Sequence, residues 1–173
     1  LMNGLVAYYN LNNITGENST NQKSFIGSER NGTLGNGALI CDGFSGKGIC
    51  FDGSNSSAGG RYFNFENPIN NMTNYSISLW VKPYSYAHDD VSEILKWNFN
   101  RITFSKGANE IGFNLYNGTT DKNIKSVVSI GEWHHVTAVR NDNNFYLYID
   151  GIQVGSSTTF GSSTDSTIQV GSR

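Results

Sequence analysis

The stretch Gly131-Glu132-Trp133-His134-His135-Val136, followed by Tyr146-Leu147-Tyr148-Ile149-Asp150-Gly151, decides the fold. Residues 133–139 and 145–149 are rich in β-branched and aromatic side chains that alternate along the chain, a pattern typical of strands. The polar residues 141–144 between the two runs predict a turn, and Asp150-Gly151 predicts the next turn. We therefore expect a β-hairpin in this part of the chain.

The same kind of pattern recurs along the rest of the sequence. It predicts strands over residues 5–10, 38–41, 48–51, 62–65, 76–82, 92–97, 101–105, 110–115, 124–126, 152–156 and 167–171. Gly, Asn, Ser and Asp residues separate these runs, and the 3.6-residue periodicity of helices is nearly absent. The sequence thus predicts an all-β protein, and its 173 residues suit a single domain over 1–173.

Further motifs appear in a fixed order before the hairpin. They are Gly4-Leu5-Val6-Ala7-Tyr8-Tyr9, Asn31-Gly32-Thr33-Leu34, Gly46-Lys47-Gly48 leading to Phe51-Asp52-Gly53, and Tyr75-Ser76-Ile77-Ser78-Leu79-Trp80-Val81-Lys82-Pro83. Together with the hairpin, they resemble the laminin-G-like, concanavalin-A-like jelly-roll domain over nearly the whole chain. The resemblance implies a two-sheet antiparallel jelly-roll sandwich that binds glycans or extracellular proteins.

Charge and hydropathy exclude two kinds of partner. Charged residues make up 15% of the chain and the net charge is -2, which argues against nucleic acid, since a nucleic-acid partner favours a basic stripe. No apolar run approaches the roughly 18 residues that a membrane span needs. No secretory signal is visible at the start, so the chain looks like a mature or excised piece.

The two cysteines indicate an oxidising compartment. Cys41 and Cys50 flank a Gly-rich loop that can bring two strands together, and we expect them to form a disulfide, with two free buried thiols as the alternative. Asn-x-Ser/Thr triplets give weak further support for an extracellular glycoprotein, because their number is only mildly above chance.

The end of the sequence predicts an open sheet edge. In the family that this chain resembles, a segment like Ile168-Gln169-Val170-Gly171 is followed by a last strand that returns beside the first strand. Here the chain stops at Arg173. We expect a cut domain, with two alternatives: a domain that closes differently, or a first-strand edge, over residues 5–10, that is covered by a neighbouring molecule.

Catalysis finds no support in the acidic or nucleophilic residues. The β-glucanases of this fold carry Glu-x-Asp-x-x-Glu on a strand, and this sequence has none. The nearest acidic cluster, Asp89-Asp90-Val91-Ser92-Glu93, lacks the spacing of a carboxylate pair. No serine lies in a Gly-x-Ser-x-Gly turn. We therefore expect a protein that is not an enzyme.

Calcium is the plausible cofactor, because domains resembling this one often hold such an ion in loops at the sandwich rim. Asp89 and Asp90 are the candidate ligands, although a solvated turn is the alternative for this cluster. Asp52 and Asp150 each precede a glycine, which favours a role in turns. His134 and His135 are adjacent on a strand and point to opposite faces, so they cannot easily bind one ion together.

Two tryptophans have a predicted orientation. We expect Trp133, His135 and Thr137 to share the inward face of a central strand, where Trp133 and His135 would be structural. Ile77, Leu79 and Val81 share one face of their strand, which leaves Trp80 on the other face. We expect a loop to cover Trp80, although it could also form the floor of a concave site.

Sugar binding would use aromatic rings with neighbouring amides, because a pyranose has an apolar face and a rim of hydroxyls. The candidate ligand-binding residues lie at or near loops and strand ends: Tyr84, Tyr86, Trp97, Phe99 and Tyr116. The sequence therefore favours an extracellular, non-catalytic recognition or adhesion module. A structural subunit of a surface or filament assembly is the main alternative, and a glycoside hydrolase is a weaker one.

Overall fold

The computed structural model describes Tyr9, Leu11 and residues 32–35, 38–51, 61–84, 91–97, 100–116, 121–158 and 167–172. Apart from Tyr9, the expected first strand over residues 5–10 lies outside these ranges. Within them the chain forms strands and turns, and no helix is long and apolar enough to cross a membrane.

The strands follow the predicted pattern closely. They are β1 (Gly32–Gly35), β2 (Leu39–Asp42), β3 (Lys47–Cys50), β4 (Tyr62–Glu66), β5 (Asn74–Val81), β6 (Val91–Trp97), β7 (Asn100–Ser105), β8 (Glu110–Tyr116), β9 (Asp121–Val127), β10 (His134–Asn141), β11 (Asn144–Ile149), β12 (Ile152–Thr158) and β13 (Thr167–Ser172). Each strand expected within the described ranges is present. The sequence pattern missed β1, which is short and has a glycine at each end.

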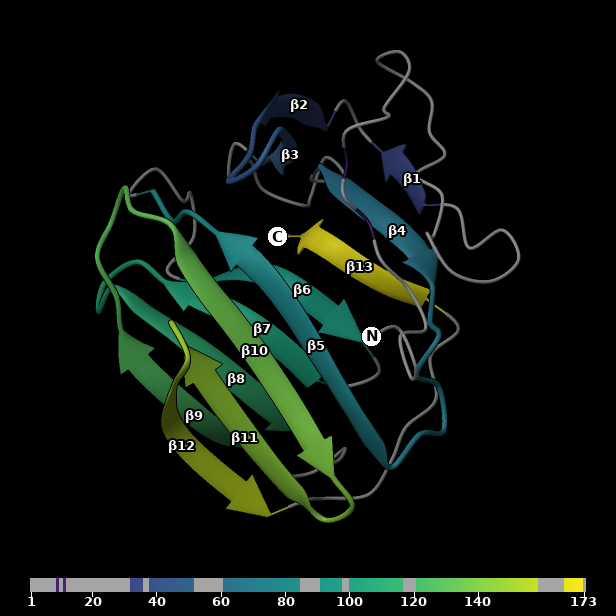
Figure 1. Ribbon diagram of the computed structural model, residues 1–173, viewed down its shortest axis with the longest axis vertical. Helices are drawn as coiled ribbons and strands as arrows, with labels where there is room; N and C mark the ends of the chain where they lie inside the picture. The colour runs from purple at the N-terminus through teal and green to yellow at the C-terminus, as the bar shows by residue number, and fades with distance from the viewer. Residues whose placement is uncertain are drawn as a thin grey trace.

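Two antiparallel sheets stack to form the sandwich (Figure 1). The larger sheet has seven strands in the order β1-β4-β13-β6-β7-β8-β9, and the smaller sheet has four in the order β12-β11-β10-β5. β2 and β3 form a separate hairpin. This architecture confirms the expected all-β, two-sheet antiparallel jelly roll, and it leaves each large sheet with one face toward the core and one face outward.

The core forms where the inward side chains of both sheets meet. On β8, Ile111 and Phe113 are fully buried, and Leu115 is 2% exposed. On β10 of the other sheet, Val136 and Ala138 are fully buried and lie opposite Leu79 and Ile77 of β5. Alternate residues therefore point into the core, and the residues between them point outward.

The orientation predicted for β10 is wrong. His134, Val136 and Ala138 are the buried residues of this strand, so Trp133 and His135 belong to the outward face. Both faces of the strand carry side chains that could fill a core, and alternation alone does not tell which face is inside. The partner strand decides, because Ile77 and Leu79 of β5 pair with the small and β-branched residues of β10.

The two-residue turn after β11 is confirmed. Asp150 and Gly151 have φ values of 52° and 80°, and they lie between the paired residues Ile149 and Ile152. Positive φ at both central positions is typical of the type I′ turn, whose twist matches that of the flanking strands. Asp and Gly tolerate this conformation, so the Asp-Gly pair sets the register of β11 against β12.

The β2–β3 hairpin carries the predicted disulfide. Cys41 and Cys50 are bonded, with their Cα atoms 5.9 Å apart. Ile40 and Ile49 of the same hairpin pack against the buried side chains of Leu34 and Phe63. The hairpin is therefore closed by a covalent bond and is also attached to the sandwich by apolar contacts.

Loss of the disulfide should lower the stability of the fold. Because the bond closes a ring of about ten residues, Cys41→Ser should reduce the free energy of unfolding by about 3 kcal/mol. Urea unfolding of the parent with and without a reductant measures the same quantity. The reduced parent should match the reduced variant, and a parent whose stability does not respond to reduction would contradict the prediction.

Candidate functional site

The outer face of the seven-stranded sheet is polar. Between the inward residues Phe63, Ile168, Ile102, Phe113 and Ile124, the strands turn amides and charged groups outward. Six of these side chains lie opposite one another in register across six strands, in the order Asn64, Gln169, Lys96, Arg101, Asn114 and Asn123. We call this set the polar row, and the surface that contains it the polar face.

A second set of polar residues supports the row. Glu93, Thr103 and Gly112 lie opposite one another on β6, β7 and β8. Although they are on the outward side, the Glu93 side chain is 7% exposed and Thr103 is 3% exposed. A buried carboxylate needs a partner, and Arg101 provides one, since its Nη1 donates to Glu93 Oε1 at 3.2 Å.

The same contacts fix two members of the polar row. Asn114 Nδ2 donates to Thr103 Oγ1 at 2.7 Å, and Glu93 holds the guanidinium of Arg101, whose side chain remains 32% exposed. Side chains that are held in place before a ligand arrives lose less conformational entropy on binding. Arg101 and Asn114 are therefore positioned before a ligand binds.

Tyr116 is the candidate aromatic residue that the structure brings to the polar face. It lies two residues after Asn114 on β8, so both side chains point to the same side, and Tyr116 is half-buried. Tyr62 on β4 lies on the same side as Asn64, beyond the other edge of the polar row. One tyrosine thus stands on each side of the row.

The other candidate aromatic residues are not brought together there. Tyr84 follows β5 and is 54% exposed, with Lys82 Nζ 5.7 Å from the centre of its ring. Tyr86 and Phe99 lie outside the described residues.

The ligand-binding role predicted for Trp97 is wrong, because its side chain is fully buried. The indole packs 5.6 Å from Phe113, centre to centre, and its Nε1 donates to the Tyr75 hydroxyl at 2.9 Å. Burial raises the pKa of Tyr75, despite the hydrogen bond from Trp97. The register of β6 against β7 shifts between Glu93 and Leu95, so counting along the strand does not give the face on which Trp97 lies.

The outer face of the four-stranded sheet carries an aromatic cluster, formed by Phe44, Trp80, Trp133 and His135. Phe44 stacks on Trp80 with ring centres 3.6 Å apart and planes 5° apart, and Trp133 lies 6.0 Å from Phe44. Phe44 comes from the tip of the disulfide-bonded hairpin. It covers Trp80 in the way that a loop was expected to, although Trp80 remains 44% exposed.

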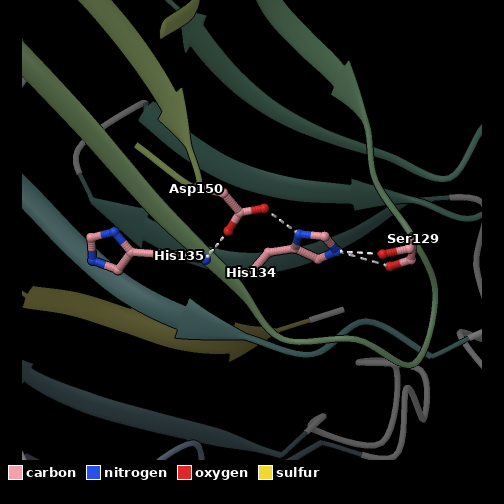
Figure 2. A network of polar contacts seen from close by, with 4 residues as sticks. All are labelled: Ser129, His134, His135 and Asp150. Atoms are coloured by element: carbon pink, nitrogen blue, oxygen red, sulfur yellow. Dashed lines mark hydrogen bonds and ion pairs between the residues drawn. The ribbon is translucent and has the colours of Figure 1, made fainter. Parts of the chain in front are cut away.

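His134 is the centre of a polar network at the start of β10 (Figure 2). Its Nδ1 lies 2.8 Å from Asp150 Oδ2, and its Nε2 lies 3.0 Å from Ser129 Oγ and 3.1 Å from the Ser129 carbonyl oxygen. Asp150 Oδ1 also accepts the backbone N–H of His135 at 2.8 Å. The carboxylate therefore joins the turn after β11 to the first residues of β10.

This network has the order hydroxyl, imidazole, carboxylate that serves nucleophilic catalysis elsewhere. Its geometry fits a structural role better. Both ring nitrogens of His134 are engaged within the protein, Nδ1 by the Asp150 carboxylate and Nε2 by the hydroxyl and carbonyl of Ser129, so the ring ties two loops to the start of β10. His134 is also buried, being 8% exposed.

Metal binding has no support within the described residues, where no group of three or more His, Cys, Asp or Glu side chains could hold an ion. The candidate calcium ligands Asp89 and Asp90, and Asp52, lie outside the described ranges. Asp150 is described, and its carboxylate oxygens are already engaged by His134 and His135.

The Asp150 network should make stability depend on pH in the acid range. Partial burial raises the pKa of Asp150, but hydrogen bonds from His134 and from the His135 N–H outweigh it and hold the pKa below its usual 3.8. A carboxylate with a lowered pKa stabilises the fold above its ordinary pKa, and this contribution is lost as the pH falls through the lowered value.

Thermal unfolding of Asp150→Asn tests this expectation. The variant should melt below the parent at pH 7, and the difference should shrink as the pH falls below the usual 3.8 and through the lowered pKa of Asp150, where the parent carboxylate becomes protonated. Asp121→Asn, which changes an exposed carboxylate of β9, is the matched control and should follow the parent. A difference that stays constant from pH 7 to the acid limit would contradict the role given to the charge.

Truncation of the inward Trp97 and of the outward Trp133 should lower the stability of the fold by different amounts. Trp97→Ala removes a fully buried indole and its hydrogen bond, and it should lower the free energy of unfolding by roughly 3–5 kcal/mol. Trp133→Ala removes a half-buried ring from the outer face and should cost clearly less. Urea unfolding of both variants gives the comparison, and equal losses would show that Trp133 is part of the core after all.

Comparison with known proteins agrees with the fold described above. The family model described as "Concanavalin A-like lectin/glucanases superfamily", of the laminin G type, matches residues 57–173. Among curated proteins, none matches the sequence.

Solved structures with the same architecture have low sequence identity. Domain 4 of AbnA, an extracellular GH43 arabinanase from Geobacillus stearothermophilus solved with arabinotriose, has a TM-score of 0.60 at 18% identity, over 83% of this chain and 74% of that chain. The carbohydrate-binding module CBM66 from Bacillus subtilis has a TM-score of 0.51 at 11% identity, over 82% and 92%. Domains LG4-5 of the mouse laminin alpha1 chain give 0.50 at 17% identity, over 73% and 36%. These likenesses concern the fold, and the family model adds the sequence: the chain belongs to the concanavalin A-like lectin/glucanase superfamily, in its laminin G branch.

Proposed function

We propose that the protein is a non-catalytic, extracellular module that binds glycans through the polar face of its seven-stranded sheet. The observation that carries the proposal is the polar row, in which six strands each place one amide or charged side chain in register. A sugar chain offers hydroxyls along its length, and a row of donors and acceptors in register can bond them one after another.

The chemistry of the face suits a hydroxylated ligand. Asn and Gln amides both donate and accept, as sugar hydroxyls do, so the amides of the row suit a ligand rich in hydroxyls. Tyr62 and Tyr116 offer ring surfaces for the apolar faces of sugar rings at the edges of the row. The fold supports the same proposal, because a carbohydrate-binding module is among the structures that share it.

An extracellular location is proposed from the disulfide and from the fold. Disulfides persist in oxidising compartments, and the Cys41–Cys50 bond closes the β2–β3 hairpin.

The proposal that the module is not an enzyme rests on the positions of its acidic side chains. Glu93 is held by Arg101, and Glu110 by Lys125 at 3.5 Å. The exposed acids on the same side, Glu66 and Asp121, stand on β4 and β9 with four strands between them, too far apart for a carboxylate pair.

Glycan-array binding of the parent and of two row variants tests the proposal. Asn114→Ala and Asn123→Ala each remove one amide of the polar row, and each should weaken binding of the array's best ligand about tenfold, the loss expected for an unmet ligand hydroxyl. Gln153→Ala removes an amide from the outer face of the other sheet, where it accepts from Tyr148, and should bind like the parent. Thermal melting of each variant checks that the fold is intact.

Two results would overturn the proposal. One is a parent that binds no glycan on a broad array. The other is a parent whose affinity falls with Gln153→Ala or Trp133→Ala and not with the row variants, which would move the site to the aromatic cluster. Release of reducing sugar from a bound polysaccharide would show an enzyme instead.

Calcium remains a separate proposal that rests on Asp89 and Asp90. The array repeated with calcium and with a chelator tests it. Loss of binding on chelation supports an ion near the ligand, and unchanged binding means that the polar face recognises its ligand without one.

A further inference from the structure

Two cations of the polar row lie side by side. Lys96 on β6 and Arg101 on β7 are directly opposite each other in the strand register, and both point outward from the seven-stranded sheet. Like charges that are directly opposite on neighbouring strands destabilise a sheet. A pair of this kind is therefore favourable only if a negative charge lies near it.

The described residues supply less negative charge than this pair requires. Among the described residues, Arg101 has one acidic contact, Glu93 Oε1 at 3.2 Å, and its side chain is 32% exposed. Lys96 is exposed, and no ion pair joins it to another of the described residues. The row neighbours on either side, Gln169 and Asn114, are neutral amides.

The rest of the polar face does not share this excess of positive charge. Lys125 on β9 has Glu110 within 3.5 Å, so that cation is compensated within the sheet. The whole chain carries a net charge of -2, so a local excess of positive charge is not a consequence of overall composition. Within the polar row, the excess of positive charge comes from the two adjacent members Lys96 and Arg101.

We propose that the ligand of the polar face carries an anionic group, a carboxylate or a sulfate ester, which binds between Lys96 and Arg101. This inference rests on the proposed glycan binding and adds the ligand class: an acidic glycan. The guanidinium of Arg101 would donate to two oxygens of the anion while Lys96 contributes a point charge. Asn114 and Gln169, on either side of the two cations, would bond hydroxyls of the same or the next sugar.

Both kinds of anion have the geometry that Arg101 favours, so paired ligands separate them. Oligogalacturonate and its methyl ester have the same sugar chain, and esterification replaces each carboxylate charge with a methyl ester. A sulfated galactan oligosaccharide and its desulfated form differ only in the sulfate. Isothermal titration of the parent with all four ligands should show at least about tenfold tighter binding for one charged form than for its neutral counterpart. The pair that shows the larger ratio identifies the anion.

Charge-removing variants locate the effect. Lys96→Gln keeps the length of the side chain and removes its charge, so it should reduce the ratio between charged and neutral ligand several-fold and make binding less sensitive to salt. Lys47→Gln removes the same charge from the β2–β3 hairpin, where Lys47 pairs with Asp42 at the surface, and should leave the ratio unchanged. Arg101→Lys keeps the charge but loses two-point donation, and it should lower affinity for the charged ligand more than for the neutral one.

The outcomes separate this inference from the glycan proposal. If neutral and charged forms bind equally and Asn114→Ala still weakens binding about tenfold, the acidic ligand class is wrong while glycan binding stands. If Lys47→Gln lowers the ratio as much as Lys96→Gln, the preference is a general charge effect and the inference is also wrong. If none of the four ligands binds and the array is negative, both proposals fail.

Discussion

The packing of the two sheets depends on the buried side chain of Trp97, which contacts residues of both sheets. Trp97 stands on β6 of the seven-stranded sheet, and its indole N–H is bonded to Tyr75 on β5 of the four-stranded sheet. Its ring packs against Phe113, which in turn lies 5.4 Å from Phe145 on the opposite sheet. These aromatic rings pack against one another from one sheet to the other. The indole N–H of Trp97, a buried donor, has the Tyr75 hydroxyl as its acceptor within the core. With Trp97 inside, Lys96 must point outward, and the composition of the polar face follows from that.

The two outer faces of the sandwich have different chemistry. On the seven-stranded sheet, amides and charges are held by Glu93 and Thr103, which are themselves almost completely buried. On the four-stranded sheet, the rings of Phe44 and Trp80 stack and the hydroxyl of Ser78 lies 2.6 Å from His135 Nε2. Aromatic stacking anchors the tip of the disulfide-bonded hairpin on the outer face of the four-stranded sheet, and Ile40 and Ile49 of the hairpin pack against Leu34 and Phe63 on the inward side of the seven-stranded sheet. The face proposed to bind ligand is thus separate from the face that holds the hairpin.

The sequence predicts local structure well and the site poorly, for a physical reason. Alternation and turn residues are local, so the strands and the Asp150-Gly151 turn could be read from short segments. The orientation of β10 could not, since Trp133 and Val136 are both suited to a core and only the pairing with β5 selects one. The polar row is still less accessible to sequence reasoning. Asn64 and Gln169 become neighbours because β13 pairs with β4, and no local sequence pattern predicts that pairing. Tyr116 was found because it ends a strand, a position that local patterns do show.

The position of β13 has a consequence for how the protein folds during synthesis. This strand, the last of those described, lies between β4 and β6 and is the element through which the β1–β4 pair is attached to the rest of its sheet. While the ribosome is still making residues 167–172, β4 and β6 each expose an unpaired edge to the cellular environment. Pairing partners so distant in sequence also form slowly. The nascent chain therefore passes through a stage with two open strand edges, and its vulnerability to aggregation is greatest just before β13 is available to close them.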